Sequence, residues 1–214
     1  MFDRLMARIS GKDAKTVDGN EVVRRSVYES ELGEADLHFA RTEPGGVEIL
    51  AFERDFSPTD AEDNGYVLLT SGMSDRAMTM PPQALSAGGK ARAELIWYVR
   101  EPTDEIIANL RWLAEFPFID AIWLGFGHRV PMPTPPLDTC NFRTFLFLTP
   151  IIGPDKRIAE TLSIDNERVE ILTVNLISDP EYALIKAEGL DPFLDLLDEN
   201  DYPPIFDPTR KSYV

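Results

Sequence analysis

The chain has 214 residues, of which 43% are hydrophobic and 10% aromatic, which is enough to bury a sizeable core in one domain. Thirty-seven Asp and Glu against 21 Lys and Arg give a formal net charge of -16. Such a field repels phosphate backbones and anionic lipid, so we expect neither nucleic-acid nor membrane-surface binding. A basic protein partner would be attracted, although the acidity can also serve solubility alone.

Cysteine usage and hydropathy indicate the compartment. The single cysteine, Cys140, cannot form an intramolecular disulfide and cannot assemble a zinc site by itself. The first residues lack the apolar core of a secretory signal, and no window approaches the roughly 18 apolar residues of a membrane span. We therefore expect a cytoplasmic protein.

The chain divides into an N-terminal arm, residues 1–34, and a domain, residues 35–214. The arm shows no sustained hydrophobic period, and we expect it to be loosely attached. One or two turns of amphipathic helix around Phe2, Leu5, Met6 and Ile9 are the alternative for its first part.

From residue 36 the pattern changes to short extended runs separated by turn residues. The first two runs flank Pro44, Gly45 and Gly46, which supply positive φ cheaply and predict a hairpin. Later runs are rich in β-branched and aromatic residues, which favour strands. The predicted strands are residues 36–40, 47–52, 66–70, 91–99, 121–124, 142–149, 156–164 and 169–177.

Three helices are predicted in the second half of the chain. Thr103 can cap the first, whose apolar residues fall on one face, and Pro117 is expected to end it. Asp179 and Asp191, each followed by proline, start the other two, and Gly189 offers a C-terminal cap between them. The proline-rich tail after residue 200 is not expected to be helical. The order of elements predicts a single-domain α+β fold, with a mainly antiparallel mixed sheet and three helices packed on it.

The segment LLTSGMSDRAM, residues 68–78, ends a buried strand in a cluster of small polar groups. Ser71, Ser74 and Asp75 together with His128 are the residue types of a hydrolase triad, but the segment is not a Gly-x-Ser-x-Gly elbow. The structural interpretation is that Ser71 and Gly72 turn the chain while Asp75 satisfies local backbone amides. Met73 and Met78 are then expected to pack inward.

Other candidate sites are weaker. Residues 125–128, GFGH, lack the third glycine and the following helix of a dinucleotide site. Asp36, His38 and His128 are too widely spaced to indicate a metal centre. We expect no catalytic residues, no metal and no cofactor. Aromatic residues near loops, including Phe116, Phe118, Trp123 and Phe126, form a protein-binding patch if exposed and core if buried, and we favour core for Trp123 and Phe118.

The order of several motifs resembles that of the suppressor of fused domain family. The motifs are LLTSGMSDR at 68–76, ELIWY at 94–98, LAEFP at 113–117, WLGFGH at 123–128, and DPTR at 207–210. The resemblance covers about residues 37–210. It implies a non-enzymatic α+β domain that binds a protein or peptide. Animal members are two-domain repressors in Hedgehog signalling that hold a short Gli peptide between their halves, and this chain resembles the N-terminal half alone, as stand-alone bacterial members do.

This resemblance implies a non-enzymatic binding domain, and with the acidic charge it leads us to expect an immunity protein that neutralises a basic polymorphic toxin. A signalling or regulatory module is the alternative. The residue types alone give the third hypothesis, a small serine hydrolase using Ser71 or Ser74 with His128. We expect a monomer or a homodimer, because an edge strand can pair between chains. The residues expected to bind the partner or to shape the binding loops are Ser71, Gly72, Met73, Ser74, Asp75, Arg76, Trp123, Gly125, Gly127 and His128.

Overall fold

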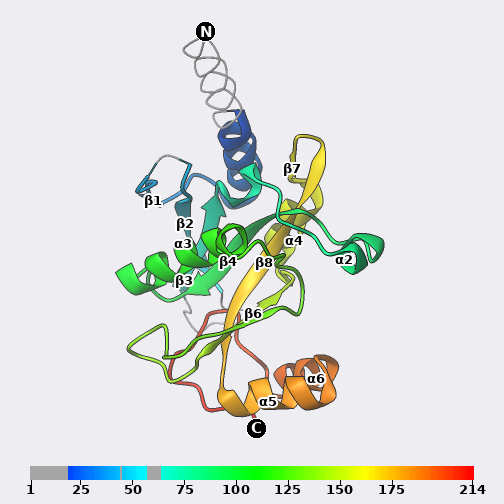
Figure 1. The fold of residues 1–214 in the computed structure, drawn as a ribbon. Helices are drawn as coiled ribbons and strands as arrows, with labels where there is room; N and C mark the ends of the chain where they lie inside the picture. Colours follow the sequence, from blue (N-terminus) through cyan, green and yellow to red (C-terminus); the bar gives the residue numbers. More distant parts are fainter. Residues whose placement is uncertain (1–18, 44, 57–63) are drawn as a thin grey trace.

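A single mixed sheet forms the centre of the computed structural model, which describes residues 19–43, 45–56 and 64–214 (Figure 1). Its strand order is β1-β2-β3-β4-β8-β6-β5, and β7 pairs with the start of β8. Among the described strands, only β4 and β8 pair in parallel, and the other pairs are antiparallel. The strands are β1 (Leu37–Phe39), β2 (Glu48–Asp55), β3 (Asn64–Ser71), β4 (Arg92–Val99), β5 (Arg129–Pro131), β6 (Thr144–Leu148), β7 (Ser163–Ile164) and β8 (Glu167–Ile177).

Helices cover both faces of this sheet, which makes the fold α+β as predicted. The three predicted helices are present as α3 (Asp104–Ile119), α5 (Asp179–Glu188) and α6 (Asp191–Glu199). Two further helices, α2 (Pro82–Ser86) and α4 (Gly153–Thr161), and one 3-10 turn, η1 (Met73–Asp75), were not predicted. Residues 19–32 are also helical.

The alternation of side chains along β8 separates the layers. Leu172, Val174 and Leu176 face the large core under α3, which crosses in front of the sheet in Figure 1. Val169 and Ile171 face the opposite side, in a core that includes residues of the N-terminal helix and α4. Further along that second face, Ile177 packs with residues of α5 and α6. The second face therefore carries two separate helical layers.

The helix α3 begins as predicted and ends later. The Thr103 side chain accepts a hydrogen bond from the Ile106 N–H, so it is the N-cap. Pro117 lies inside the helix, which continues to Ile119. A proline in the last turn removes one intrahelical hydrogen bond only, and burial of Pro117 offsets that loss.

Two predicted strands are wrong. Residues 121–124 form a turn and an irregular segment, in which the Ile122 N–H bonds back to the Pro117 carbonyl and Leu124 is buried. Residues 153–161 are the helix α4, and only residues 163–164 of the predicted strand pair with β8. Ile158 and Leu162 are buried four residues apart, which is a helical spacing that the strand prediction overlooked.

The expected loose attachment of the arm does not hold for residues 19–32. Tyr28 in this helix is fully buried, and its hydroxyl donates to the Thr70 carbonyl at 2.9 Å. Arg24 is fully buried as well. Residues 1–18, including the alternative helix around Phe2, lie outside the described residues.

Candidate functional site

The polar segment after β3 forms a tight turn inside the protein. Gly72 has φ 132°, and a Cβ atom there would lie 3.2 Å from the Gly46 carbonyl oxygen and 3.5 Å from the Val47 Cα atom. Only glycine adopts this conformation without strain. The 3-10 turn η1 follows, and Met73 and Met78 both pack inward, as the sequence predicted.

A buried charge network holds this turn. The Glu94 carboxylate accepts hydrogen bonds from the Gly72 N–H, from the Ser74 N–H and, at 2.6 Å, from the Ser74 hydroxyl. Arg24 donates to Ser71 Oγ at 3.0 Å and to both carboxylate oxygens of Asp75. Burial acts to lower the pKa of Arg24, but the charges of Glu94 and Asp75 outweigh it, and the pKa is raised. The network therefore joins the N-terminal helix to the ends of β3 and β4.

This arrangement explains the residue types of the motif. Ser71, Gly72, Met73 and Ser74 are buried, and Asp75 is partly buried against Arg24 rather than bonded to its own loop. Arg76 is exposed and lies over the Phe118 ring at 3.9 Å. A role of these residues in contacting a partner stays a prediction; their geometry shapes the interior.

The second predicted group surrounds a sharp loop between α3 and β5. Trp123 donates to the Lys90 carbonyl at 2.8 Å, and its ring meets the His128 ring edge-on with centroids 4.8 Å apart. A Cβ atom on Gly125 would lie 2.5 Å from the Trp123 ring, and Gly127 has φ 77°. Both glycines are therefore required by the close approach or the backbone conformation of this loop. Trp123 and Phe118 are partly buried and pack against the core under α3, as expected.

A groove of about 670 Å³ opens beside this loop, at the β5 edge of the sheet. We call it the β5 groove. Its walls come from α3, from the loop before β5, from β5 and the residues after it, and from α5. The lining residues are Trp112, Phe116, Ile122, Leu124, His128, Arg129, Val130, Pro131, Met132, Pro133, Tyr182 and Lys186.

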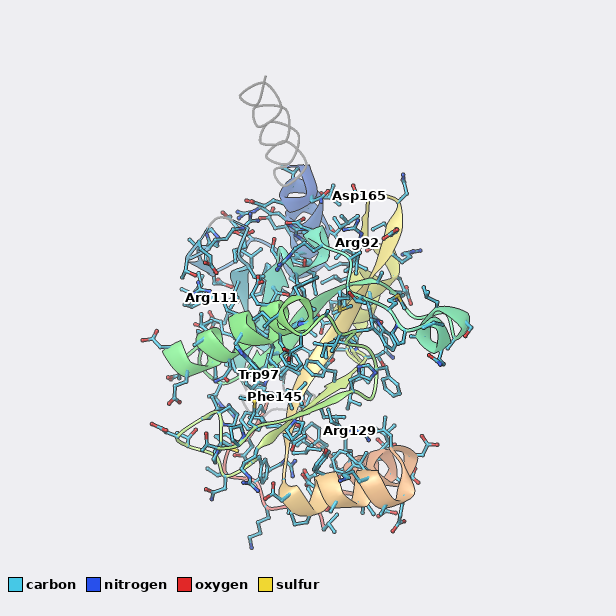
Figure 2. The ribbon with its side chains drawn as sticks, in the orientation of Figure 1. Arg92, Trp97, Arg111, Arg129, Phe145 and Asp165 are labelled. Atoms are coloured by element: carbon cyan, nitrogen blue, oxygen red, sulfur yellow. The ribbon has the colours of Figure 1, made fainter. Side chains whose placement is uncertain are left out.

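The register of β5 shows which backbone groups face the groove. The His128 carbonyl accepts from the Phe147 N–H, and the Met132 N–H donates to the Arg143 carbonyl. Backbone direction alternates along an antiparallel pair, so residues 128, 130 and 132 point toward β6. The N–H and C=O of Arg129 and the C=O of Pro131 therefore point to the open side, where no further strand pairs among the described residues. Figure 2 shows Arg129 on the side of the molecule where α5 lies.

The groove contains cationic and aromatic groups in a protein of opposite net charge. Arg129 and Lys186 line it, and the Lys186 ammonium lies 5.7 Å from the Tyr182 ring centroid. Burial is the main cause that lowers the pKa of His128, with the charge of Arg129 acting in the same direction. His128 is therefore neutral at pH 7, and the two cations set the local charge.

Only His128 of the ten predicted site residues lines the β5 groove, while Trp123 and Gly125 support the loop behind it. Sequence reasoning missed the helical walls. Trp112 and Phe116, with ring centroids 5.0 Å apart, and Tyr182 with Lys186 are both i, i+4 pairs. That spacing was visible in the sequence, but an apolar helix face facing a groove has the same pattern as one facing the core.

The serines considered for a hydrolase site, and Asp36 and His38 considered for a metal site, have hydrogen-bond partners within the protein. Ser71 Oγ accepts from Arg24 and Ser74 Oγ donates to Glu94, so both serines are bonded within the buried network. The Asp36 carboxylate accepts a hydrogen bond from the Glu53 N–H, and His38 Nε2 lies 2.6 Å from Glu48 Oε2. Within residues 19–43, 45–56 and 64–214, no cluster of three or more His, Cys, Asp or Glu suits a metal ion. No described helix is long and apolar enough to cross a membrane.

An α+β domain with an open sheet edge beside a groove is the class that the fold and the site define. The sequence profile of the suppressor of fused protein family matches residues 44–211. The chain therefore belongs to the suppressor of fused family, as its motifs predicted.

Several solved structures share the fold of this chain. A protein from Neisseria gonorrhoeae described as a homologue of suppressor of fused superposes with a TM-score of 0.67 at 18% identity, over 92% of this chain and 97% of that one. Drosophila Suppressor of Fused gives 0.66 at 10% identity, over 90% of this chain and 50% of the Drosophila chain. A chain of the Sufu–Fu complex gives 0.63 at 12% identity, over 92% of both chains. No curated protein matches the sequence.

Proposed function

We propose that this protein is a non-enzymatic binding domain that pairs an extended peptide segment of a partner protein with β5. The observation that carries the proposal is the open edge of β5, whose outward backbone groups at Arg129 and Pro131 border a preformed groove. Addition of a strand to such an edge is a common mode of peptide recognition. The likeness to a chain of the Sufu–Fu complex supports a protein partner.

The two faces of the sheet give the peptide its expected chemistry. Val130 and Met132 belong to the face under α3, where Trp112 and Phe116 lie. Arg129 pairs with Leu146, a residue of the opposite face, where Lys186 lies on α5. Side chains of a paired strand alternate between the two faces. We expect apolar side chains at one set of alternate positions and acidic side chains at the other.

Selection from a displayed library of extended peptides, with binding then measured by fluorescence anisotropy, tests this proposal. Arg129→Pro removes the outward N–H, while Arg129→Ala keeps it and removes only the charge. We expect Arg129→Ala to weaken acidic peptides by about five- to tenfold and Arg129→Pro to abolish binding of all selected peptides. Equal binding by the wild type and by folded Arg129→Pro would overturn strand pairing.

A photo-crosslinking amino acid locates a natural partner on the surface. It replaces Trp112 in the groove in one variant and Leu85, which is exposed on α2, in the matched control. The proposal expects a partner that crosslinks from position 112, not from position 85, and that is lost when Arg129→Pro is added. Crosslinks from position 85 alone contradict it.

A more specific form of this proposal is that the partner is a basic toxin and that the protein acts as an immunity protein in the cytoplasm. The net charge of -16 supports it, because such a field steers a basic protein and accelerates association at low salt. Co-expression with a toxin domain encoded in a neighbouring reading frame should restore growth. Growth arrest despite soluble protein would leave the alternative, a signalling or regulatory module, with the same groove and a different partner.

A further inference from the structure

The outer face of the N-terminal helix, residues 19–32, carries no charged residue. Its exposed positions are Gly19, Val22, Val23, Ser26 and Ser30. Val22 is 68% exposed and Val23 is 41% exposed, so two apolar side chains lie open to solvent. The exposed positions of α3, α4, α5 and α6 all include charged side chains, as is usual for a surface helix. An uncharged outer face is therefore an exception in this acidic chain, and Figure 1 shows the helix, in blue, at one end of the molecule.

Buried contacts fix which face of this helix is turned outward. Arg24 and Tyr28 are fully buried, so the helix cannot rotate about its own axis without breaking their contacts. Glu21 accepts a hydrogen bond from Arg41 at 3.1 Å, and Glu31 accepts one from Arg157 at 2.7 Å. The uncharged face is therefore preformed before any partner binds.

The two flanks of the outer face differ in chemistry. Successive residues of an α-helix are about 100° apart around its axis, so with Ser26 at the centre, Arg25 and Glu29 lie on one flank and Val23 and Val27 on the other. Glu29 has no ion-pair partner among the described residues. The Arg25 guanidinium lies 4.0 Å from its nearest carboxylate, at the outer limit of an ion pair. One flank thus presents a cation and an anion one helical turn apart.

We propose that this face binds the same face of a second copy of the chain, with the two helices antiparallel about a two-fold axis at Ser26. A two-fold interface brings one surface patch against itself. In an antiparallel pair each flank meets the same flank of the other helix, so Arg25 of each copy meets Glu29 of the other, and the valine flanks pack together. A parallel pair would place Arg25 and Glu29 against the valine flank and leave both charges unmatched.

The charge distribution favours a second copy as the occupant. A basic partner is attracted by the net charge of -16, but it gains nothing from a face without charge. Two copies repel each other over most of their surfaces, whereas contact at this face adds two Arg–Glu pairs and buries Val22 and Val23 of each copy. One pair of short helices is smaller than a standard interface, so the expected dimer is weak and reversible. It leaves the β5 groove free, since none of these residues lines that groove.

Analytical ultracentrifugation of the full chain at about 0.15 M salt, where the Debye length is about 8 Å, measures the dimer. We expect the average mass to rise from that of the monomer toward that of the dimer between about 1 µM and about 1 mM protein. Ser26→Glu places two carboxylates at the two-fold axis and should weaken the dimer by about tenfold or more. Ala187→Glu, at an exposed position of α5, adds the same charge elsewhere and should leave the dimer unchanged. A wild type that stays monomeric throughout overturns the proposal, as does equal weakening by the two variants.

Exchange of the flanking charges tests the direction of the helices. Arg25→Glu and Glu29→Arg should each weaken the dimer, because each brings like charges together across the interface. The two substitutions combined recreate both pairs with reversed sign and should restore the affinity to within about threefold of the wild type. A combined variant that is folded by circular dichroism and stays as weak as the single variants contradicts the antiparallel pairing.

Disulfide formation locates the two-fold axis. A disulfide joins Cα atoms less than about 7 Å apart, and a residue at the axis lies next to itself in the other copy. Ser26→Cys should therefore give a covalent dimer on mild oxidation. Ser30→Cys is the matched control on the same face, because its two copies would lie about 12 Å apart along the helices and should not crosslink. Cys140 is only 4% exposed, so the wild type should stay uncrosslinked. Equal crosslinking from positions 26 and 30, or none from position 26, contradicts the proposed interface.

Discussion

The guanidinium of Arg24 lies 3.6 Å from the Glu94 carboxylate, and both side chains are fully buried. Arg24 also donates to Asp75, so one cation from the N-terminal helix faces two carboxylates, one from β4 and one from η1. Removal of Arg24 would leave these two charges in a site shielded from water.

Arg24→Ala should therefore lower the free energy of unfolding by about 3–5 kcal/mol, because an uncompensated buried charge is costly. Urea denaturation followed by tryptophan fluorescence measures this change. Arg25→Ala is the control: Arg25 is half-exposed and its guanidinium lies 4.0 Å from the Glu48 carboxylate, so its loss should cost less than about 1 kcal/mol. Equal effects of the two substitutions would contradict the role of the buried network.

The C-terminal tail gives a pH prediction. Arg210 donates to both carboxylate oxygens of Glu181, which also accepts from the Ser178 and Tyr213 N–H groups. Burial acts to raise the pKa of Glu181, but these hydrogen bonds outweigh it, and the pKa lies below its ordinary value of 4.5.

Because the folded-state pKa of Glu181 is below its unfolded value, its ionised carboxylate stabilises the protein at any pH above the unfolded pKa. This contribution is lost as the pH falls below about 4.5 toward the folded-state pKa. Glu181→Gln should reduce stability at pH 7 and flatten the decline between pH 5 and 3. Thermal unfolding at a series of pH values measures both. Glu188→Gln, at an exposed position of the same helix, should leave the profile unchanged. A decline as steep in Glu181→Gln as in the wild type would contradict the assignment.

The loop behind the β5 groove depends on Gly125. Gly125→Ala should destabilise the protein by about 1–3 kcal/mol, because the new methyl group would overlap the Trp123 ring. It should also shift the tryptophan emission as that ring moves. Gly19→Ala, where no atom beyond the chain neighbours would lie within 4 Å, is the control and should be close to neutral. Unfolding curves of the two variants that coincide would show that the loop adjusts freely.

The serine hydroxyls give a prediction on chemistry. A serine-reactive fluorophosphonate should not label the folded protein, because Ser71 and Ser74 are fully buried. Ser74→Ala should instead lower the free energy of unfolding by about 1–3 kcal/mol, since Glu94 loses its hydroxyl donor. Labelling of the wild type that disappears in His128→Ala would support the hydrolase alternative.

The elements that the sequence predicted share local signals. The hairpin of β1 and β2 has Gly45 and Gly46 between its strands, and α3 has its Thr103 cap. The α5 helix has a capping box between Ser178 and Glu181. The failures are elements whose local pattern was ambiguous: α4 has only nine residues, and the apolar run at 121–124 has no strand to pair with.

The sequence by itself determined the α+β class and the family, because hydrophobic periodicity, caps and motif order are local properties of the chain. It also marked Gly72 as a turn position and Gly125 as a loop-shaping position. Only the tertiary structure decided that the Ser71–Asp75 segment is an interior network, since Arg24 and Glu94 reach it from distant parts of the chain. The β5 groove likewise arises where helices far apart in sequence meet one sheet, and the spacing of residues along the chain does not reveal it.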